Sequence, residues 1–210
     1  MHDRQLDGRT LVFGNQSALY KTAMTWFDHA TGSIWSQPIG TALAGELKGT
    51  RLRQIPSTLH TWEAFRTQYP DAKVMATGSG GLKLFRETPR DDWVIGVALG
   101  DDASAVYFPF ALRQGVVHAD VGGAPVLVWA DAESRTVRAY LARVEDRTLS
   151  FESLDDGRLR DRETGSIWDA RTGLAQQGEL AGKNLSPVPW TSSFDWAWRD
   201  FYPNAEFIGR

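Results

Sequence analysis

The stretch Asp28–Trp35, with the sequence DHATGSIW, recurs 133 positions later as Asp161–Trp168, with the sequence DRETGSIW. The same register continues without a gap through Gly45–Leu47 and Gly178–Leu180, and on to Tyr69-Pro70 and Tyr202-Pro203. Repeats are the first pattern to settle, because a missed repeat leads to a wrong fold. A gap-free match of this length indicates that the chain is internally duplicated.

Each copy is predicted to contain a β-hairpin around its Asp. In the first copy, the β-prone segment Met24–Phe27 is followed by a turn, and Ile34-Trp35 begins the return strand. The Asp28 side chain can cap this turn, and Gly32 can adopt a positive φ. Upstream, Arg9–Phe13 resembles Arg147–Phe151 with an offset of 138, so the first copy carries five extra residues (138 − 133).

Each copy is also predicted to close on a short helix. In the first copy, Thr61 is a suitable N-cap, and Trp62, Phe65 and Tyr69 share one helical face. Pro70 ends this helix. The second copy has the equivalent aromatic stripe Phe194, Trp198, Phe201 and Tyr202.

Strands are expected to dominate the segment between the copies. Trp93–Leu99 and Ala124–Ala130 are continuous apolar runs, typical of strands buried on both faces. Gly122-Gly123 suits a tight hairpin turn, and Thr136–Arg143 alternates, with Val137, Ala139 and Leu141 on one face. The glycine-rich loop Thr77–Gly81 is not followed by Gly-Lys-Ser/Thr, so a phosphate-binding loop is not expected.

These patterns predict one mainly β, β-rich α+β domain over residues 1–210, with pseudo-two-fold symmetry and two short helices. Repeat unit one covers residues 9–76, a central strand-rich segment residues 77–146, and repeat unit two residues 147–210. No polar linker is long enough to separate independent domains. The strands can form either a barrel or a sandwich, and closure into a barrel would remove exposed strand edges.

Composition excludes several classes of function. The net charge of −3 gives no basic surface for nucleic acid, and no apolar run reaches the roughly 20 residues of a membrane span. Without cysteine the chain has no disulfide, no catalytic thiolate and no Cys-ligated zinc. No pattern calls for a cofactor. The compartment and the oligomeric state, including a homo-oligomer, stay open.

Duplicated carboxylates are the first candidates for chemistry. Asp28 and Asp161, or Glu46 and Glu179, would form an acid/base pair if they met near the pseudo-two-fold axis, as in glycoside hydrolysis. Pepsin-like proteases also carry duplicated Asp-Thr-Gly loops, but here two residues separate Asp from Thr-Gly, which argues against a shared-proton dyad. The simpler interpretation is that the Asp residues cap turns and that the Glu residues are solvated.

The other candidate sites are a metal site and an aromatic surface. His118 and Asp120 lie two residues apart on one strand face, but no third metal ligand is suggested by spacing. No Gly-x-Ser-x-Gly motif supports serine hydrolase chemistry. The chain has nine Trp, ten Phe and five Tyr, mainly expected in the core. A ligand platform would use Trp35, Trp168 and Trp196.

The doubled motif, together with Phe13-Gly14 near the start, Gly-x-Leu-x-Gly-x-x-Leu, and Tyr-Pro after each helix, resembles the prokaryotic domain-of-unknown-function family DUF3179. The resemblance covers essentially the whole chain. It implies no activity, because the family is uncharacterised. Members typically carry a Cys-Pro-x-Cys segment just upstream of the position of Met1, and often an export signal or membrane anchor. This sequence begins just after that segment, as either a shortened version or a natural variant without the pair, so the resemblance suggests export or anchoring only through a missing N-terminal part.

Two functional hypotheses follow. The leading one is a non-enzymatic binding or assembly module for a protein partner or a glycan. The rival is a hydrolase that uses the duplicated carboxylates. The two differ in whether the side chains of Asp28 and Asp161 bond only within their own turns or open onto a common pocket.

Overall fold

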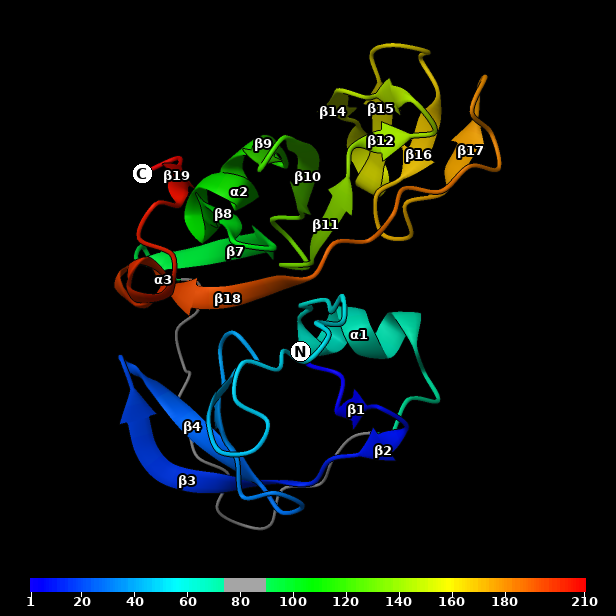
Figure 1. The fold of residues 1–210 in the computed structure, drawn as a ribbon. Helices are drawn as coiled ribbons and strands as arrows, with labels where there is room; N and C mark the ends of the chain where they lie inside the picture. The colour runs from blue at the N-terminus through cyan, green and yellow to red at the C-terminus, as the bar shows by residue number, and fades with distance from the viewer. Residues whose placement is uncertain (74–89) are drawn as a thin grey trace.

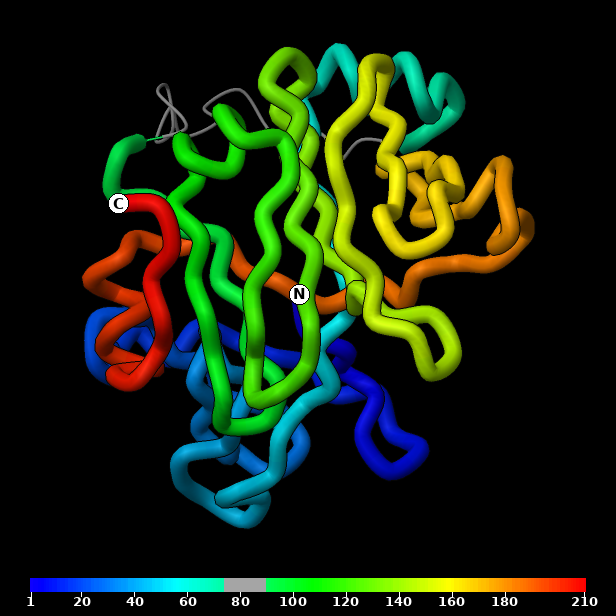
Figure 2. The backbone as a smooth tube through the Cα atoms, turned by 90° about the horizontal axis from the view of Figure 1, so that it is seen from above, coloured from blue at the N-terminus to red at the C-terminus, as the bar shows by residue number. Residues whose placement is uncertain are grey.

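The computed structural model of this chain describes residues 1–73 and 90–210. The predicted loop Thr77–Gly81 lies outside the described residues. Figure 1 shows the N-terminal strands on one side of strand β18 (Trp190–Phe194) and the central and C-terminal strands on the other. The view in Figure 2 shows the central strands running side by side. The described residues form a β-rich α+β fold, as the sequence predicts.

The first copy forms a four-stranded antiparallel sheet in the order β3-β4-β5-β6. The predicted hairpin is present, with Trp26 opposite Trp35 and Phe27 opposite Ile34. A short hairpin of β1 and β2 precedes the sheet. The strands are β1 (Gln5–Leu6), β2 (Arg9–Thr10), β3 (Phe13–Tyr20), β4 (Ala23–Asp28), β5 (Ile34–Ser36) and β6 (Ala42–Ala44).

The second copy repeats this sheet in the order β14-β15-β16-β17. Strands β16 and β17 begin and end 133 positions after β5 and β6, and the ladder is irregular at the same place, between Ile34 and Trp35 and between Ile167 and Trp168. The structure therefore carries the duplication down to the register of its strands. The strands are β12 (Arg143–Val144), β13 (Arg147–Thr148), β14 (Phe151–Ser153), β15 (Arg158–Asp161), β16 (Ile167–Asp169) and β17 (Ala175–Gln177), with a 3-10 turn η1 (Asp155–Gly157) before β15.

The copies differ most in their first hairpin. Strand β3 has eight residues, whereas its counterpart β14 has three. A register shift between Asn15 and Leu19 lies within the longer hairpin. The extra residues of the first copy therefore extend a hairpin, whose exposed tip includes Leu19 and Tyr20.

The central strands form two sheets. One has the order β18-β7-β8-β19, with β18 antiparallel to β7 and β19 parallel to β8. The other is the antiparallel meander β9-β10-β11. The predicted runs Trp93–Leu99 and Ala124–Ala130 are strands β7 and β10, and Gly122-Gly123 is the turn before β10. The remaining strands are β8 (Asp102–Tyr107), β9 (Val116–Val121), β11 (Val137–Leu141) and β19 (Glu206–Ile208).

Two of the three helices in the described residues are the predicted ones. Helix α1 (Trp62–Gln68) begins after Thr61, whose Oγ1 accepts the Ala64 N–H at 3.2 Å. Helix α3 (Asp195–Phe201) occupies the equivalent place in the second copy.

Strands dominate the central segment as expected, but the prediction of two helices missed a third one there. Helix α2 (Phe108–Gln114) follows β8 directly and ends at Gly115. Pro109 suits its first turn, and Phe108 and Ala111 form its buried face. An aromatic-rich helix of 7 residues, about two turns, has too little periodicity to be distinguished from a strand in sequence.

The hydrophobic core is unevenly divided. The largest clusters lie on the two faces of the central meander, and one of them includes Trp168 of the second copy. The first copy has a small cluster of its own, built from Leu11, Trp35, Ala42 and Leu52. None of the sheets formed by residues 1–73 and 90–210 closes into a barrel. No helix in this part of the chain is long and apolar enough to cross a membrane.

Candidate functional site

Asp28 is fully buried, and both of its carboxylate oxygens bond within the Asp28 turn. Oδ1 accepts the Thr31 N–H at 2.6 Å, and Oδ2 accepts the indole Nε1–H of Trp35 at 2.9 Å. The Thr31 hydroxyl also bonds the carboxylate. The Asp28 carboxylate therefore caps the turn and anchors the Trp35 ring.

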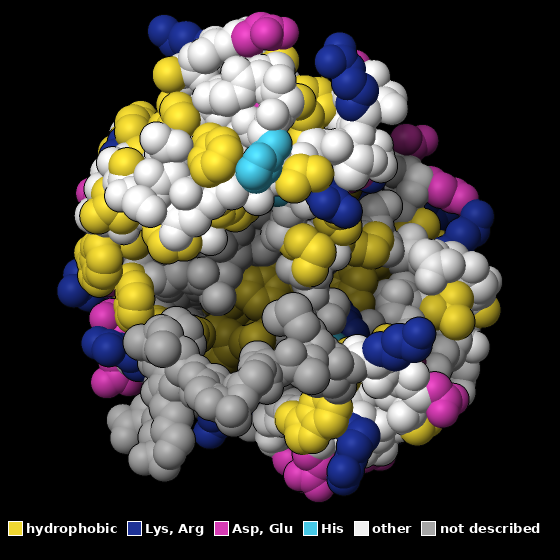
Figure 3. All heavy atoms as spheres, turned by 90° about the horizontal axis from the view of Figure 1, so that it is seen from below, with side chains coloured by type: hydrophobic (Ala, Val, Ile, Leu, Met, Phe, Trp, Pro, Cys, Tyr) yellow, Lys and Arg dark blue, Asp and Glu magenta, His cyan; other side chains and the backbone are white. Residues whose placement is uncertain are grey.

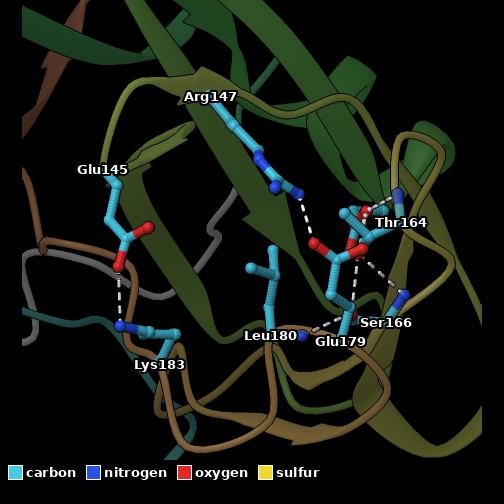
Figure 4. A network of polar contacts seen from close by, with 8 residues as sticks. Glu145, Arg147, Thr164, Ser166, Glu179, Leu180 and Lys183 are labelled. Carbon is cyan, nitrogen blue, oxygen red and sulfur yellow. Dashed lines mark hydrogen bonds and ion pairs between the residues drawn. The ribbon is translucent and has the colours of Figure 1, made fainter.

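Asp161 repeats this arrangement in the second copy. Its Oδ1 accepts the Thr164 N–H at 2.6 Å, and its Oδ2 accepts the Trp168 Nε1–H at 2.8 Å. Figure 4 shows the neighbouring part of this turn, where the Leu180 N–H donates to the Ser166 hydroxyl at 3.1 Å. In the first copy the Leu47 N–H donates to Ser33 at 3.0 Å.

Opposing effects act on the pKa of Asp28. Burial alone would raise the pKa of this carboxyl group, but hydrogen bonds from Trp35, Thr31 and the Ala30 backbone outweigh it. The pKa of Asp28 is therefore lowered, and the group is held as a carboxylate. This charge state suits a hydrogen-bond acceptor in a turn.

Trp35 and Trp168, two of the predicted ligand-binding residues, are the central aromatic rings of the two copies. Both are completely buried, and both indole N–H groups donate to their own Asp. Phe13 and Phe151 pack edge-on against them at centroid distances of 5.6 and 5.8 Å. These rings face core side chains instead of solvent.

The chain contains a third turn of this kind, at Asp131, which sequence reasoning missed. Asp131 Oδ1 accepts the Ser134 N–H at 2.6 Å, as Asp28 accepts that of Thr31. The hydroxyls of Ser134 and Thr136 lie 2.7 Å apart, matching Thr31 and Ser33 at 2.6 Å. The backbone N–H of Asp131 donates to the Thr136 carbonyl, as that of Asp28 donates to the Ser33 carbonyl. The turn joins β10 to β11, as its two relatives join β4 to β5 and β15 to β16.

The third turn differs from the others in its side chains. Arg135 has a positive φ of 52° where the other turns have Gly32 and Gly165. Arg138 occupies the position of the anchoring Trp. The shared signal is Asp-x-x-Ser/Thr-x-Ser/Thr before a strand, and this weaker pattern would have found the turn at Asp131.

His60 closes the third turn from a distant segment. Its Nδ1 lies 3.2 Å from Thr136 Oγ1, and its Nε2 lies 3.3 Å from Nη1 of Arg138. A guanidinium can only donate, so Nε2 must be the acceptor and Nδ1 must carry the proton. His60 is therefore neutral here, and burial followed by the charge of Arg138 lowers its pKa.

Arg138 is a buried cation without a carboxylate at ion-pair distance among residues 1–73 and 90–210. It is 8% exposed, and its Nε–H donates to the Arg171 carbonyl at 2.8 Å. Burial lowers the pKa of its guanidinium. A pocket of about 500 Å³ opens beside this cluster, and its charged lining is mixed: Glu63, Glu133 and Arg171. This mixture does not select a ligand of one charge.

The predicted carboxylates Glu46 and Glu179 are both exposed. Glu179 Oε1 forms an ion pair with Arg147 at 2.5 Å on the outside of the second copy (Figure 4). The pairings predicted from the sequence join the two copies, Asp28 with Asp161 or Glu46 with Glu179, and each Asp carboxylate bonds within its own turn.

The predicted metal candidates His118 and Asp120 each have a structural partner. His118 Nε2 accepts the Phe151 N–H at 2.9 Å, and Asp120 Oδ1 accepts the Gly123 N–H at 2.7 Å. The first contact joins β9 to the second copy, and the second caps the hairpin turn. Among the described residues, no group of three or more His, Asp or Glu side chains is arranged to hold a metal ion.

Trp196, the third predicted ligand-binding residue, lies on the surface. It is 48% exposed and stacks on Phe194, with a centroid distance of 5.5 Å and an interplanar angle of 8°. The guanidinium of Arg90 lies 5.3 Å from the Phe194 ring centroid. Trp196 therefore presents part of an indole ring at the end of β18.

A large cavity in the described part of the chain lies between the first copy and β18, and we call it the groove. It has a volume of about 720 Å³, within the range of ligand sites. Arg4 is the only charged side chain among the described residues that line it, and no carboxylate does so. Figure 3 shows a face of the molecule that is hollowed, with hydrophobic side chains on the floor of the hollow. The lining residues are Met1, His2, Arg4, Phe13, Gly14, Asn15, Trp26, Gln37, Pro38, Leu52, Thr191, Ser192 and Ser193.

His2 is held in the wall of the groove. Its Nε2 bonds the Gln37 carbonyl at 3.0 Å, and burial lowers its pKa. Gly40 makes room for the ring, because a Cβ at this position would lie 2.6 Å from His2 Nδ1. The neighbouring Trp26 ring meets His2 edge-on at 6.3 Å.

The first copy is joined by polar contacts to the part of the chain that carries β18, including its neighbours β7 and α3. Gln54 Nε2 donates to Thr191 Oγ1 at 3.0 Å, and Thr22 Oγ1 donates to Asp200 Oδ2 at 2.8 Å. Arg51 Nη1 donates to the Gly100 carbonyl at 3.2 Å. These contacts fix the first copy against the sheet that carries β18 and leave the groove between them.

Fold and site together define a β-rich α+β protein built on repeated Asp turns, with a nearly uncharged groove beside one copy. The family model described as "Protein of unknown function (DUF3179)" matches residues 1–92 and 85–205. The chain belongs to this family, which confirms the resemblance found in its motifs. No curated protein and no solved structure gives a significant match to the chain.

Proposed function

We propose that this protein is a non-enzymatic binding or assembly module that takes a protein partner or a glycan into the groove between the first copy and β18. The observation that carries the proposal is the character of this groove. It combines apolar and aromatic side chains with uncharged hydroxyl and amide groups, which is the usual composition of a ligand pocket.

The rival hydrolase has less support from the same residues. A glycosidase needs two carboxyl groups that can reach the substrate, one of them as a proton donor. Asp28 and Asp161 bond inside their own turns, and the described lining of the groove contains no carboxylate. Binding requires neither group to be free.

The experiment is a blocking substitution in the groove. Ser192 is exposed and lines the groove, so Ser192→Trp should fill part of its volume. Wild type and variant would be compared on a glycan array and against a displayed library of random peptides, followed by calorimetry with the selected ligand. We expect the Kd for that ligand to rise at least about tenfold, close to 1.4 kcal/mol.

A matched control is Gln176→Trp, which adds the same ring to an exposed position on β17, away from the groove. Its affinity should equal that of the wild type. Equal affinity of the Ser192→Trp variant and the wild type would refute the groove as the binding site. Turnover of a glycan by wild type that is lost in Asp161→Asn, with folding retained, would instead support the hydrolase.

A further inference from the structure

Among the described residues, strand β18 has a free edge on the side of the groove. In its sheet it pairs only with β7, and the described residues place no strand on its other side. In Figure 1 that other side faces the N-terminal strands. A free edge offers a row of backbone donors and acceptors to another chain.

The register identifies which backbone groups point outward. The Asp195 N–H donates to the Asp92 carbonyl at 2.8 Å, in line with the β18–β7 ladder. Residues of an antiparallel strand bond their partner alternately. Thr191 and Ser193 therefore bond β7, while the N–H and C=O of Ser192 point toward the groove.

Ser192 is also accessible, and its outward backbone groups have no hydrogen-bond partner among the described residues. Its neighbours in the groove include the apolar and aromatic side chains of Phe13, Trp26 and Leu52. A backbone edge thus lies beside a mostly apolar wall.

We infer that the groove binds an extended polypeptide segment of a protein partner, which adds to the free edge of β18 as a further strand. Main-chain hydrogen bonds to Ser192 supply affinity, and every second side chain of the segment enters the apolar part of the groove. A glycan lacks the alternating N–H and C=O groups that match this edge. The inference rests on the proposed function and names the partner of the same groove.

The segment should have an apolar residue at alternate positions. Since Arg4 is the only charged side chain in the described lining, these inward side chains should be uncharged or, next to Arg4, acidic. β-Branched and aromatic residues suit an added strand. This pattern is the expected consensus of peptides selected from a displayed random library.

The test uses two substitutions at one residue of the full chain. Ser192→Pro removes the outward N–H and leaves the bonds to β7 in place, because proline is tolerated on an edge whose N–H faces away from the ladder. Ser192→Ala removes only the hydroxyl. With a selected peptide, we expect Ser192→Pro to weaken binding at least about tenfold more than Ser192→Ala does, because only the proline removes the backbone donor.

A second measurement does not depend on the folding of any variant. Single N-methyl groups placed along the peptide should abolish binding at every second position, because only alternate amides face β18. Equal effects at all positions, or equal binding by Ser192→Pro and Ser192→Ala, would overturn strand addition. Binding of glycans but of no library peptide, still blocked by Ser192→Trp, would also overturn it while leaving the proposed function intact.

Discussion

The imidazole Nδ1 of His60 lies 3.2 Å from the hydroxyl of Thr136, and the side chain of His60 thereby closes a turn that belongs to another segment. In the turns at Asp28 and Asp161, which we call the two regular turns, a backbone N–H donates to the serine at the position of Thr136. The strand bridge is also equivalent, since Leu59 bridges Val137 as Ala44 pairs with Ile34. His60 therefore stands where Gly45 stands in the first copy, and it ties the segment before α1 to the central meander.

This contact predicts a pH-dependent stability. The pKa of His60 in the folded protein lies below its ordinary value of 6.5. His60 stays neutral in both states above that value, so its contribution is fully present there. As the pH falls, the unfolded chain takes up the proton first, and the contribution is lost as the pH passes through the lowered folded pKa. Urea unfolding of wild type and His60→Ala from pH 8 to pH 5 should show a difference of about 1 kcal/mol that shrinks in acid.

His60→Asn is the control for this experiment. Its amide N–H can donate to Thr136 but does not titrate, so it should restore stability at pH 8 and remove the His60 contribution to the pH dependence. His2 and His118 also have lowered pKa values, and comparison with the variants cancels their effects. A wild-type minus His60→Ala difference that is constant with pH would contradict a neutral, bonded His60.

The indole N–H groups of Trp35 and Trp168 should matter for stability. Trp35→Phe and Trp168→Phe each remove a donor to a buried carboxylate while keeping an aromatic ring in the core. We expect each to lower the free energy of unfolding by about 1–3 kcal/mol. Trp62→Phe, at a position 55% exposed, should change it by less than about 0.5 kcal/mol. Similar losses in all three variants would argue against the anchoring role.

The Asp28 carboxylate should stabilise the fold only while it is ionised. Asp28→Asn replaces an acceptor-only group with an amide that cannot accept from both Thr31 and Trp35. At neutral pH the loss should be about 1.5–3 kcal/mol, the cost of hydrogen bonds to a charged group. Because the pKa of Asp28 is lowered in the fold, this stabilisation is present above its ordinary pKa and is lost as the pH falls through the folded value. Chemical unfolding of both proteins from pH 7 to pH 2 should show the two curves converging only below about pH 4.

Sequence alone predicts the parts of this fold that depend on local chemistry. The Asp28 and Asp161 turns, the N-cap at Thr61, and the buried strands Trp93–Leu99 and Ala124–Ala130 all follow from spacing and residue type. Repetition strengthens the signal of the Asp28 and Asp161 turns, because two copies must satisfy the same turn.

The missed features depend on contacts between distant segments. The turn at Asp131 keeps its hydrogen bonds but replaces the Thr-Gly-Ser pattern, and its closing residue His60 lies 76 positions before Thr136. The groove and the free edge of β18 arise only when the second copy pairs with β7. No local pattern in Thr191–Ser193 indicates which side of that strand is unpaired.

The two regular turns share one geometry, which predicts that alanine costs more stability at Gly45 than at Gly49. Gly45 and Gly49 both have a positive φ, of 92° and 88°, so alanine strains the backbone at either position by about 1–3 kcal/mol. A Cβ at Gly45 would also lie 2.7 Å from the Ser33 Cα, whereas nothing lies within 4 Å at Gly49. Overlap with backbone should add about 1–3 kcal/mol to the cost of Gly45→Ala. Thermal and urea unfolding of the two variants measures this difference.

Gly178→Ala and Gly182→Ala repeat the comparison in the second copy, where Ser166 Cα is also 2.7 Å away, and keep the test informative if Gly45→Ala does not fold. Equal losses of stability within each pair would mean that Ser33 and Ser166 can shift at little cost. The close approach of the two segments would then not hold the turn in place.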